Sequence, residues 1–323
     1  MREMRLSRRT LFYSAALTCG LALIACSDNN SAPVIEFSEP LEAHRADTAP
    51  HQHAESETVY RFGFDLRASP QEDARQYLPF LRYLEHSTGY RFKLHFAADQ
   101  HIIDDLGTNT VQFAALGASS YILAKHRYGA IPVVRGLNHD NKAEYRSALV
   151  VAPNSAIQRI ADLKGKRMAF GNISSTQGHL IPRIILSEFN VELSELNGYE
   201  YTGSHSRCAD AVISGRYDVC GMQDTMAEHL AAQGLLKILH FSEYFPSSGI
   251  TANKYVPDEV IANVRNALVN FQPNGRDGPK LYNWDKTEMP NGFVATHDED
   301  YAKLRRWSIA LGLIELNEPA QTP

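Results

Sequence analysis

Strand-like and helix-like patterns alternate along this chain from residue 59 onward, and this alternation constrains the fold more than any other feature. Residues 60–64 alternate apolar and polar side chains, as a half-buried strand does. The run Ser-Pro-Gln-Glu at 69–72 then offers a helix cap, a proline at the first helical position and a capping-box glutamate, and Gly89 ends this helix. Such alternation predicts an α/β architecture with mostly parallel strand pairing.

The same alternation of strand-like and helix-like patterns continues through the rest of the chain. We predict further strands at 92–96, 111–115, 131–134, 147–151, 167–170, 217–220 and 236–240. We predict further helices at 101–106, 119–126, 157–163, 176–189, 206–214, 225–233 and 300–311. The 265 residues from 59 to 323 exceed the usual size of one compact core, so two lobes are expected.

The order of these elements predicts a chain that leaves one lobe and later returns to it. We assign residues 59–151 and 244–323 to lobe I and residues 152–243 to lobe II. The chain must then cross between the lobes twice. Two crossing strands of this kind form a hinge around a cleft.

The N-terminal residues have the order of a secretory signal peptide, which we assign to residues 1–25. Four arginines lie within the first nine residues, and an apolar run too short to span a bilayer follows. The run ends in Leu-Ile-Ala-Cys at 23–26, which resembles the bacterial lipobox and implies lipidation of Cys26. A spare cysteine in an ordinary signal peptide is the alternative. Residues 7–12 also resemble a twin-arginine signal, so both Sec and Tat export stay open.

Residues 26–58 are predicted to be the lipidated cysteine and a flexible tether, because they are polar and lack an apolar period. Their histidines fit no metal geometry, and we expect no metal site. Removal of residues 1–25, with four arginines and one glutamate, changes the net charge from −5 to −8, which disfavours nucleic-acid binding. We expect the mature chain on the periplasmic face of the cell envelope. Ser27 leaves the choice between inner and outer membrane open.

Two cysteines remain in the mature body after Cys26 is lipidated. Cys208 is expected on a helix and Cys220 on the strand that follows it. An oxidising compartment permits a disulfide between them. Two buried free thiols are the alternative.

The most informative run for function is residues 170–182. A strand ends at Gly171, hydroxyl residues turn the chain, and a helix begins, so backbone N–H groups and the positive end of the helix dipole converge on one point. Such a point suits a tetrahedral anion, and Ser174, Ser175 and Thr176 supply further donors. The plainer interpretation is an ordinary helix cap.

This loop is where the sequence becomes similar to a known family. Ser174-Ser175-Thr176-Gln177-Gly178, followed by Leu180 and Pro182, resembles the phosphonate/phosphite periplasmic binding proteins of ABC transporters. The resemblance extends to Gly203-Ser204-His205, to Tyr145-Arg146-Ser147, and to Pro79, Leu84 and Gly89. It implies a type II periplasmic-binding fold whose lobes close on the ligand, and an ABC permease as partner.

The resemblance also implies roles for particular residues. Ser175 and Thr176 would donate hydrogen bonds to the oxyanion, with the backbone of Gln177. His205 would contact another oxygen, and Tyr145 would contribute its hydroxyl from the hinge side.

Three positions depart from the family pattern. Thr225 and Ser248 stand where receptors for aminoalkylphosphonates carry carboxylates for the ligand amine, and Gln100 stands where a tyrosine is typical. A buried ammonium requires a counter-charge, so a smaller anion such as phosphite, methylphosphonate or phosphate is favoured.

A second candidate donor site lies at residues 115–121, where glycine and hydroxyl residues again stand at a strand-to-helix turn. Ser119, Ser120 and Tyr121 are its candidate ligand contacts. One more helix cap is the alternative.

Two functions remain open at this point. The first is capture of a small phosphorus oxyanion for an ABC transporter. The second is sensing, in which the tethered protein presents an oxyanion, arsenite included, to a membrane histidine kinase or chemoreceptor. An enzyme is not expected, because the sequence has no nucleophile-elbow motif, metal-ligand cluster or nucleotide loop, and no cofactor is expected either.

Overall fold

The computed structural model describes residues 58–65, 70–97 and 101–314, all of which belong to one compact unit, Ala54–Pro323. The predicted signal peptide, Cys26 and residues 27–57 of the predicted tether lie outside the described residues. Ser69 and Gln100 lie outside them too. No helix among the residues described is long and apolar enough to cross a membrane.

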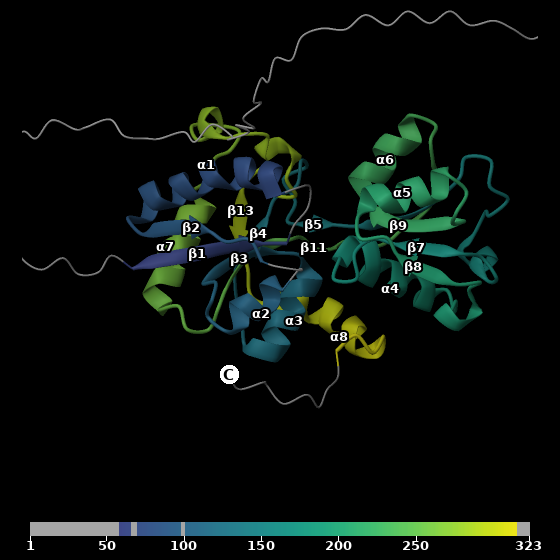
Figure 1. Ribbon diagram of the computed structural model, residues 1–323, viewed down its shortest axis with the longest axis horizontal. Coiled ribbons are helices and arrows are strands. Elements are labelled where there is room, and N and C mark those ends of the chain that lie inside the picture. Colours follow the sequence, from purple (N-terminus) through teal and green to yellow (C-terminus); the bar gives the residue numbers. More distant parts are fainter. Residues whose placement is uncertain (1–57, 66–69, 98–100, 315–323) are drawn as a thin grey trace, which may run out of the picture. The chain divides into compact units, whose positions relative to one another are not determined.

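A six-stranded mixed sheet organises the first lobe, with the strand order β13-β4-β12-β3-β1-β2 (Figure 1). Its strands are β1 (Val59–Phe64), β2 (Arg91–Leu94), β3 (Phe113–Leu116), β4 (Ile131–Gly136), β12 (Gly249–Ala252) and β13 (Phe293–Ala295). β1 pairs in parallel with β2 and β3. β12 lies antiparallel between β3 and β4, so a segment from late in the chain completes the sheet.

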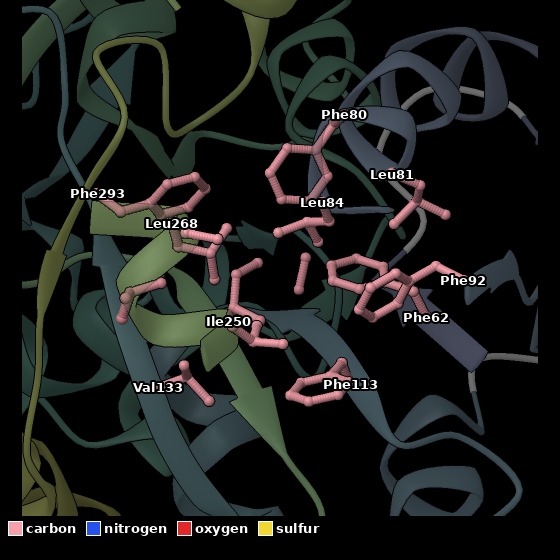
Figure 2. Packing of buried hydrophobic residues seen from close by; sticks show 14 of the residues in the cluster. Phe62, Phe80, Leu81, Leu84, Phe92, Phe113, Val133, Ile250, Leu268 and Phe293 are labelled. Carbon is pink, nitrogen blue, oxygen red and sulfur yellow. The ribbon is translucent and has the colours of Figure 1, made fainter. Parts of the chain in front are cut away.

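Helices cover both faces of this sheet. α1 (Pro70–Thr88) and α7 (Asp258–Val269) pack on one face, and α2 (Ile102–Gly107) and α3 (Ala118–Tyr128) pack on the other (Figure 1). Figure 2 shows how Phe80 and Leu84 of α1 meet Phe62 of β1 in the core under the first pair of helices. All three side chains are fully buried. Burial of side chains of this size contributes about 1.5–3 kcal/mol each.

A five-stranded sheet organises the second lobe, with the strand order β10-β6-β9-β7-β8. Its strands are β6 (Ser147–Val151), β7 (Met168–Phe170), β8 (Tyr199–Tyr201), β9 (Val219–Gln223) and β10 (Lys237–Phe241). α5 (His205–Ile213) and α6 (Asp224–Ala232) cover one face, and α4 (Ile181–Glu188) covers the other (Figure 1). The carboxyl end of β7 therefore feeds the loop that precedes α4.

Two short strands connect the lobes. β5 (Glu144–Tyr145) and β11 (Phe245–Pro246) pair antiparallel in a sheet of their own. β5 follows β4 of the first sheet and precedes β6 of the second, and β11 follows β10 and precedes β12. The last helix, α8 (Ala302–Ala310), packs against α3 through Leu304 and the preceding Tyr301. The two-lobed α/β fold with crossing hinge strands is confirmed.

The strand directions and the place of residues 147–151 differ from the predictions. Mostly parallel pairing is wrong, because β4, β6, β10, β12 and β13 all pair antiparallel. β6 and β12 each follow a hinge strand directly, and each runs opposite to both strands that it pairs with. In addition, the strand at 147–151 was placed at the end of lobe I, whereas β6 lies between β9 and β10 in the second sheet.

Candidate ligand-binding site

A cavity of about 420 Å³ is lined by residues of both lobes and of the hinge strand β5. Six of the residues predicted to contact ligand line it, namely Tyr145, Ser174, Ser175, Thr176, Gln177 and His205. They come from β5, from the loop after β7 and from the start of α5. Segments that lie far apart in the sequence thus bring the predicted donors to one place.

The loop after β7 is held in shape by two glycines in close contact. Gly171 N–H donates to the carbonyl of Gly178 at 2.8 Å, and Gly178 N–H donates to Ser175 Oγ at 2.9 Å. A Cβ on Gly178 would lie 3.0 Å from Ser175 Oγ and 3.1 Å from both Gly171 Cα and His205 Cε1. A side chain at position 178 would therefore force Ser175, Gly171 or the His205 ring to shift by a few tenths of an ångström. The helix begins here with a π-helical turn, Thr176–Leu180.

A buried histidine, His179, is hydrogen-bonded to this loop. His179 Nδ1 lies 2.6 Å from the carbonyl oxygen of Ile173, and its Nε2 lies 3.0 Å from the hydroxyl of Tyr201. Burial lowers the pKa of His179 to about 4. The ring is therefore neutral at pH 7, with Nδ1–H donating to Ile173 and Nε2 accepting from Tyr201.

The three hydroxyls of the loop have different hydrogen-bond roles. Ser174 Oγ donates to Asn172 Oδ1 at 2.8 Å. Ser175 Oγ accepts from Gly178 N–H, and Thr176 Oγ1 accepts from Ser119 N–H at 2.8 Å. Neither of the last two bonds uses the proton of the accepting hydroxyl, and the Thr176 hydroxyl also forms a hydrogen bond with the phenol of Tyr145.

His205 is the first residue of α5, directly after the N-cap Ser204. Gln223 N–H lies 3.4 Å from His205 Nδ1 and donates to it. An Nδ1 that accepts leaves the ring proton on Nε2 in the neutral imidazole.

Tyr145 lines the cavity from β5, and its side chain is almost fully buried. Its hydroxyl oxygen accepts from Ala118 N–H at 3.4 Å. Burial, with a smaller contribution from the charge of Glu288, raises the pKa of Tyr145 well above its usual value. The phenol therefore stays protonated at any pH near neutrality.

Gln177 ties the loop to the hinge. Its side-chain amide donates to the carbonyl of Arg146 at 2.9 Å and to Asp224 at 3.3 Å, and its backbone carbonyl accepts from Ser147 Oγ at 2.7 Å. The backbone of this residue was predicted to contact the anion. The structure adds that its side chain connects the loop to the strand after β5.

Of the second predicted donor site at 115–121, Gly117 lines the cavity but the three predicted contacts do not. Ser119, Ser120 and Tyr121 do not line the cavity, because α3 begins at Ala118 and its first turn packs inward. Ser119 acts through its backbone N–H, which holds Thr176. Tyr121 is buried and donates to Asp298, and burial raises the pKa of Tyr121.

Sequence reasoning missed an acidic wall on the first-lobe side of the cavity. Its carboxylates are Asp65, Glu72, Asp73 and Glu288. Asp65 directly follows β1, Glu72 and Asp73 lie in the first turn of α1, and Glu288 comes from late in the chain. A carboxylate at the carboxyl end of a parallel strand is a recognisable signal for a site residue, and Asp65 could have been found from it.

The acidic wall bears on whether the cavity can accept a ligand that carries an amine. Ser248 does line the cavity, and its hydroxyl donates to the carboxylate of Glu288. Thr225 does not line it, and the neighbouring Asp224 pairs with Arg146. Thr225 and Ser248 therefore do not leave the cavity without carboxylates, because four come from other elements.

Cys208 and Cys220 are joined by a disulfide, which the sequence analysis allowed, and their Cα atoms lie 5.7 Å apart. The bridge connects α5, which begins with His205, to β9, which ends at Gln223. Both cysteines are fully buried. Across the part of the chain that the structure covers, no group of three His, Cys, Asp or Glu side chains is arranged to hold a metal ion.

The fold and the cavity define a class, the two-lobed periplasmic binding proteins. Their crystal structures include PhnD1 of Prochlorococcus marinus in complex with methylphosphonate, at a TM-score of 0.68 and 17% identity over 79% of this chain and 99% of that chain. A binding protein component of an ABC phosphonate transporter from Pseudomonas aeruginosa superimposes at a TM-score of 0.67, with 22% identity over 80% of this chain and 87% of that chain. At these identities the likeness concerns the fold.

Sequence comparison identifies the family. The family described as "ABC transporter, phosphonate, periplasmic substrate-binding protein" matches residues 62–301. The phosphonates-binding periplasmic protein of Escherichia coli is 27% identical over 234 residues, which is 69% of each chain. The phosphate-import protein PhnD of Mycolicibacterium smegmatis is 25% identical over 214 residues, 61% of this chain and 64% of that protein. The chain belongs to the family of periplasmic substrate-binding proteins of phosphonate ABC transporters.

Proposed function

We propose that the mature chain captures a small phosphonate in this cavity and delivers it chemically unchanged to an ABC permease. The observation that carries the proposal is that Ser175, Thr176 and His205, from the loop after β7 and the start of α5, line one cavity. Hydroxyl donors bind an oxyanion without a buried cation of their own. This suits a receptor, which must also release its ligand.

The acidic wall restricts the ligand further. Ionised carboxylates accept hydrogen bonds and do not donate them. Their negative charge also disfavours a second negative charge on the ligand. A fully ionised dianion such as sulfate is therefore disfavoured, and a singly protonated phosphonate or a ligand with an ammonium group is favoured.

The experiment is a calorimetric titration of the mature protein with methylphosphonate, 2-aminoethylphosphonate, phosphite, phosphate and sulfate. We expect binding of at least one phosphonate and no measurable binding of sulfate. His205→Ala should weaken the phosphonate affinity by about 1–3 kcal/mol, because it removes one donor to a charged group. Thermal unfolding of the same variant shows whether the fold is intact. Equal affinity for sulfate and phosphonates, or an unchanged isotherm for His205→Ala, would remove the proposed site.

We also propose that lipid on Cys26 anchors the protein at the periplasmic face of the envelope. The support is the lipobox-like run at 23–26 and the polar segment that follows it. Cells that express the full chain should incorporate labelled palmitate into it, and the protein should sediment with membranes. Cys26→Ser should abolish both. Labelling that persists in Cys26→Ser would contradict the anchor.

A further inference from the structure

The direction of the hydrogen bonds around the loop after β7 indicates which ionisation state of the ligand fits. We propose that the site selects the singly protonated monoanion of its phosphonate, with Ser174 Oγ accepting the hydrogen bond of the P–OH group. This inference deepens the proposed function and rests on it.

The hydroxyl proton of Ser174 is committed within the loop. Asn172 Oδ1 accepts from Ser174 N–H at 2.9 Å and from Ser174 Oγ at 2.8 Å. An amide oxygen has no proton to give, so in the second bond Ser174 is the donor. Since a hydroxyl carries one proton, the Ser174 oxygen that lines the cavity offers lone pairs alone.

The neighbouring Ser175 has the opposite polarity. Its Oγ accepts from Gly178 N–H, so that bond does not use its hydroxyl proton. A donor at Ser175 beside an acceptor at Ser174 matches an oxyanion that presents both a bare oxygen and a P–OH group. A doubly charged phosphonate would place a bare oxygen against the lone pairs of Ser174.

The charges that face the cavity also favour the monoanion. Among the described residues that line it, the charged and titratable groups are the carboxylates of Asp65, Glu72, Asp73 and Glu288, the ammonium of Lys286, the imidazole of His205 and the phenol of Tyr145. Carboxylates near a bound phosphonate disfavour its second negative charge and so raise the pKa of its last proton. The acidic wall therefore supports the monoanion that the hydrogen-bond pattern selects.

The test uses the mature protein and methylphosphonate over pH 6 to 9, with calorimetry in two buffers of different ionisation enthalpy and ³¹P NMR of the bound ligand. Above the second pKa of free methylphosphonate we expect uptake of about one proton per ligand bound, and a Kd that rises about tenfold per pH unit. The bound ³¹P resonance should keep the shift of the monoanion. A Kd independent of pH, no proton uptake, or a bound resonance at the dianion shift would overturn the proposal. Absence of methylphosphonate binding at every pH would overturn the proposed function, and the selection with it.

Matched variants assign the effect to Ser174. Ser174→Ala removes the acceptor and should weaken monoanion binding about fivefold while flattening the pH dependence. Ser175→Ala removes a donor and should weaken binding at every pH while leaving proton uptake unchanged. Asn172→Ala frees the Ser174 proton and should also flatten the pH dependence. If Ser174→Ala and Ser175→Ala gave the same pH profile, Ser174 would not be the group that accepts the hydrogen bond of the ligand's P–OH.

His205 is the other group that could take up a proton. His205→Gln keeps a side-chain N–H donor and does not titrate. We expect proton uptake to persist in this variant. Loss of uptake would assign the proton to the imidazole and overturn the proposal.

Discussion

Replacement of Thr176 by valine tests both halves of the site, because the hydroxyl of Thr176 connects them. Valine has nearly the same shape but lacks the oxygen that accepts from Ser119 N–H at 2.8 Å. Thr176 is 4% exposed, so water cannot easily replace that acceptor. An unsatisfied buried N–H costs about 1–3 kcal/mol, and we expect the free energy of unfolding to fall by this amount.

The same substitution removes one donor to the oxyanion. A hydrogen bond to a charged group contributes about 1.5–3 kcal/mol, so the Kd for methylphosphonate should rise about 10- to 150-fold. Thr176→Ser keeps the hydroxyl and should stay within about threefold of the natural protein. The assays are calorimetric titration for affinity and urea unfolding for stability. If the valine and serine variants bound methylphosphonate equally well, Thr176 would not be a ligand donor.

Three further predictions concern the groups that support the site. Because the folded-state pKa of His179 is about 4 and its ordinary value is 6.5, the unfolded chain binds more protons between these pH values, and stability should rise by about 3 kcal/mol from pH 4 to pH 6.5. Urea unfolding across this range checks it, and His179→Gln should show a smaller rise; an equal rise would exclude His179 as the cause. Gly178→Ala should weaken ligand binding at least tenfold, because its Cβ would meet the His205 ring at 3.1 Å; an unchanged isotherm would contradict this contact. Loss of the Cys208–Cys220 disulfide, which spans 12 positions, should lower the free energy of unfolding by about 3 kcal/mol. Denaturation of the natural protein and of the double alanine variant measures the difference, and equal midpoints would show that the bridge does not stabilise the fold.

The loop after β7 could be predicted from sequence because its signals are local, whereas His205 was predicted from the resemblance to the family. A strand end, small hydroxyl residues and a helix start lie next to one another at 170–182, and their chemistry does not depend on distant contacts. The direction of each hydrogen bond could not be predicted in this way. It depends on Ser119 and Gln223, which tertiary structure brings to the loop.

The acidic wall and the second donor site show the limit of local patterns. Glu288 reaches the cavity only because the chain returns to the first lobe after β11, and no spacing in the sequence connects it with Asp65. Residues 119–121 have the right composition for donors. However, the orientation of α3 directs Tyr121 toward Asp298 and away from the cavity.

The elements predicted best are those with a clear period and a clear stop. α1 begins at Pro70 and ends before Gly89, which has a positive φ of 76°. β8, β12 and β13, of three or four residues each, were missed. Their places in the sheets are set by pairing with neighbours from distant parts of the chain.

The most direct test of ligand capture at the loop after β7 is a crystal structure of the mature protein with methylphosphonate. We expect the phosphonate oxygens to lie within hydrogen-bonding reach of the Ser175 and Thr176 hydroxyls and of the His205 ring. The P–OH oxygen should lie beside Ser174 Oγ. A ligand bound elsewhere on the protein, or a cavity that stays empty at saturating methylphosphonate, would contradict the assignment of this site.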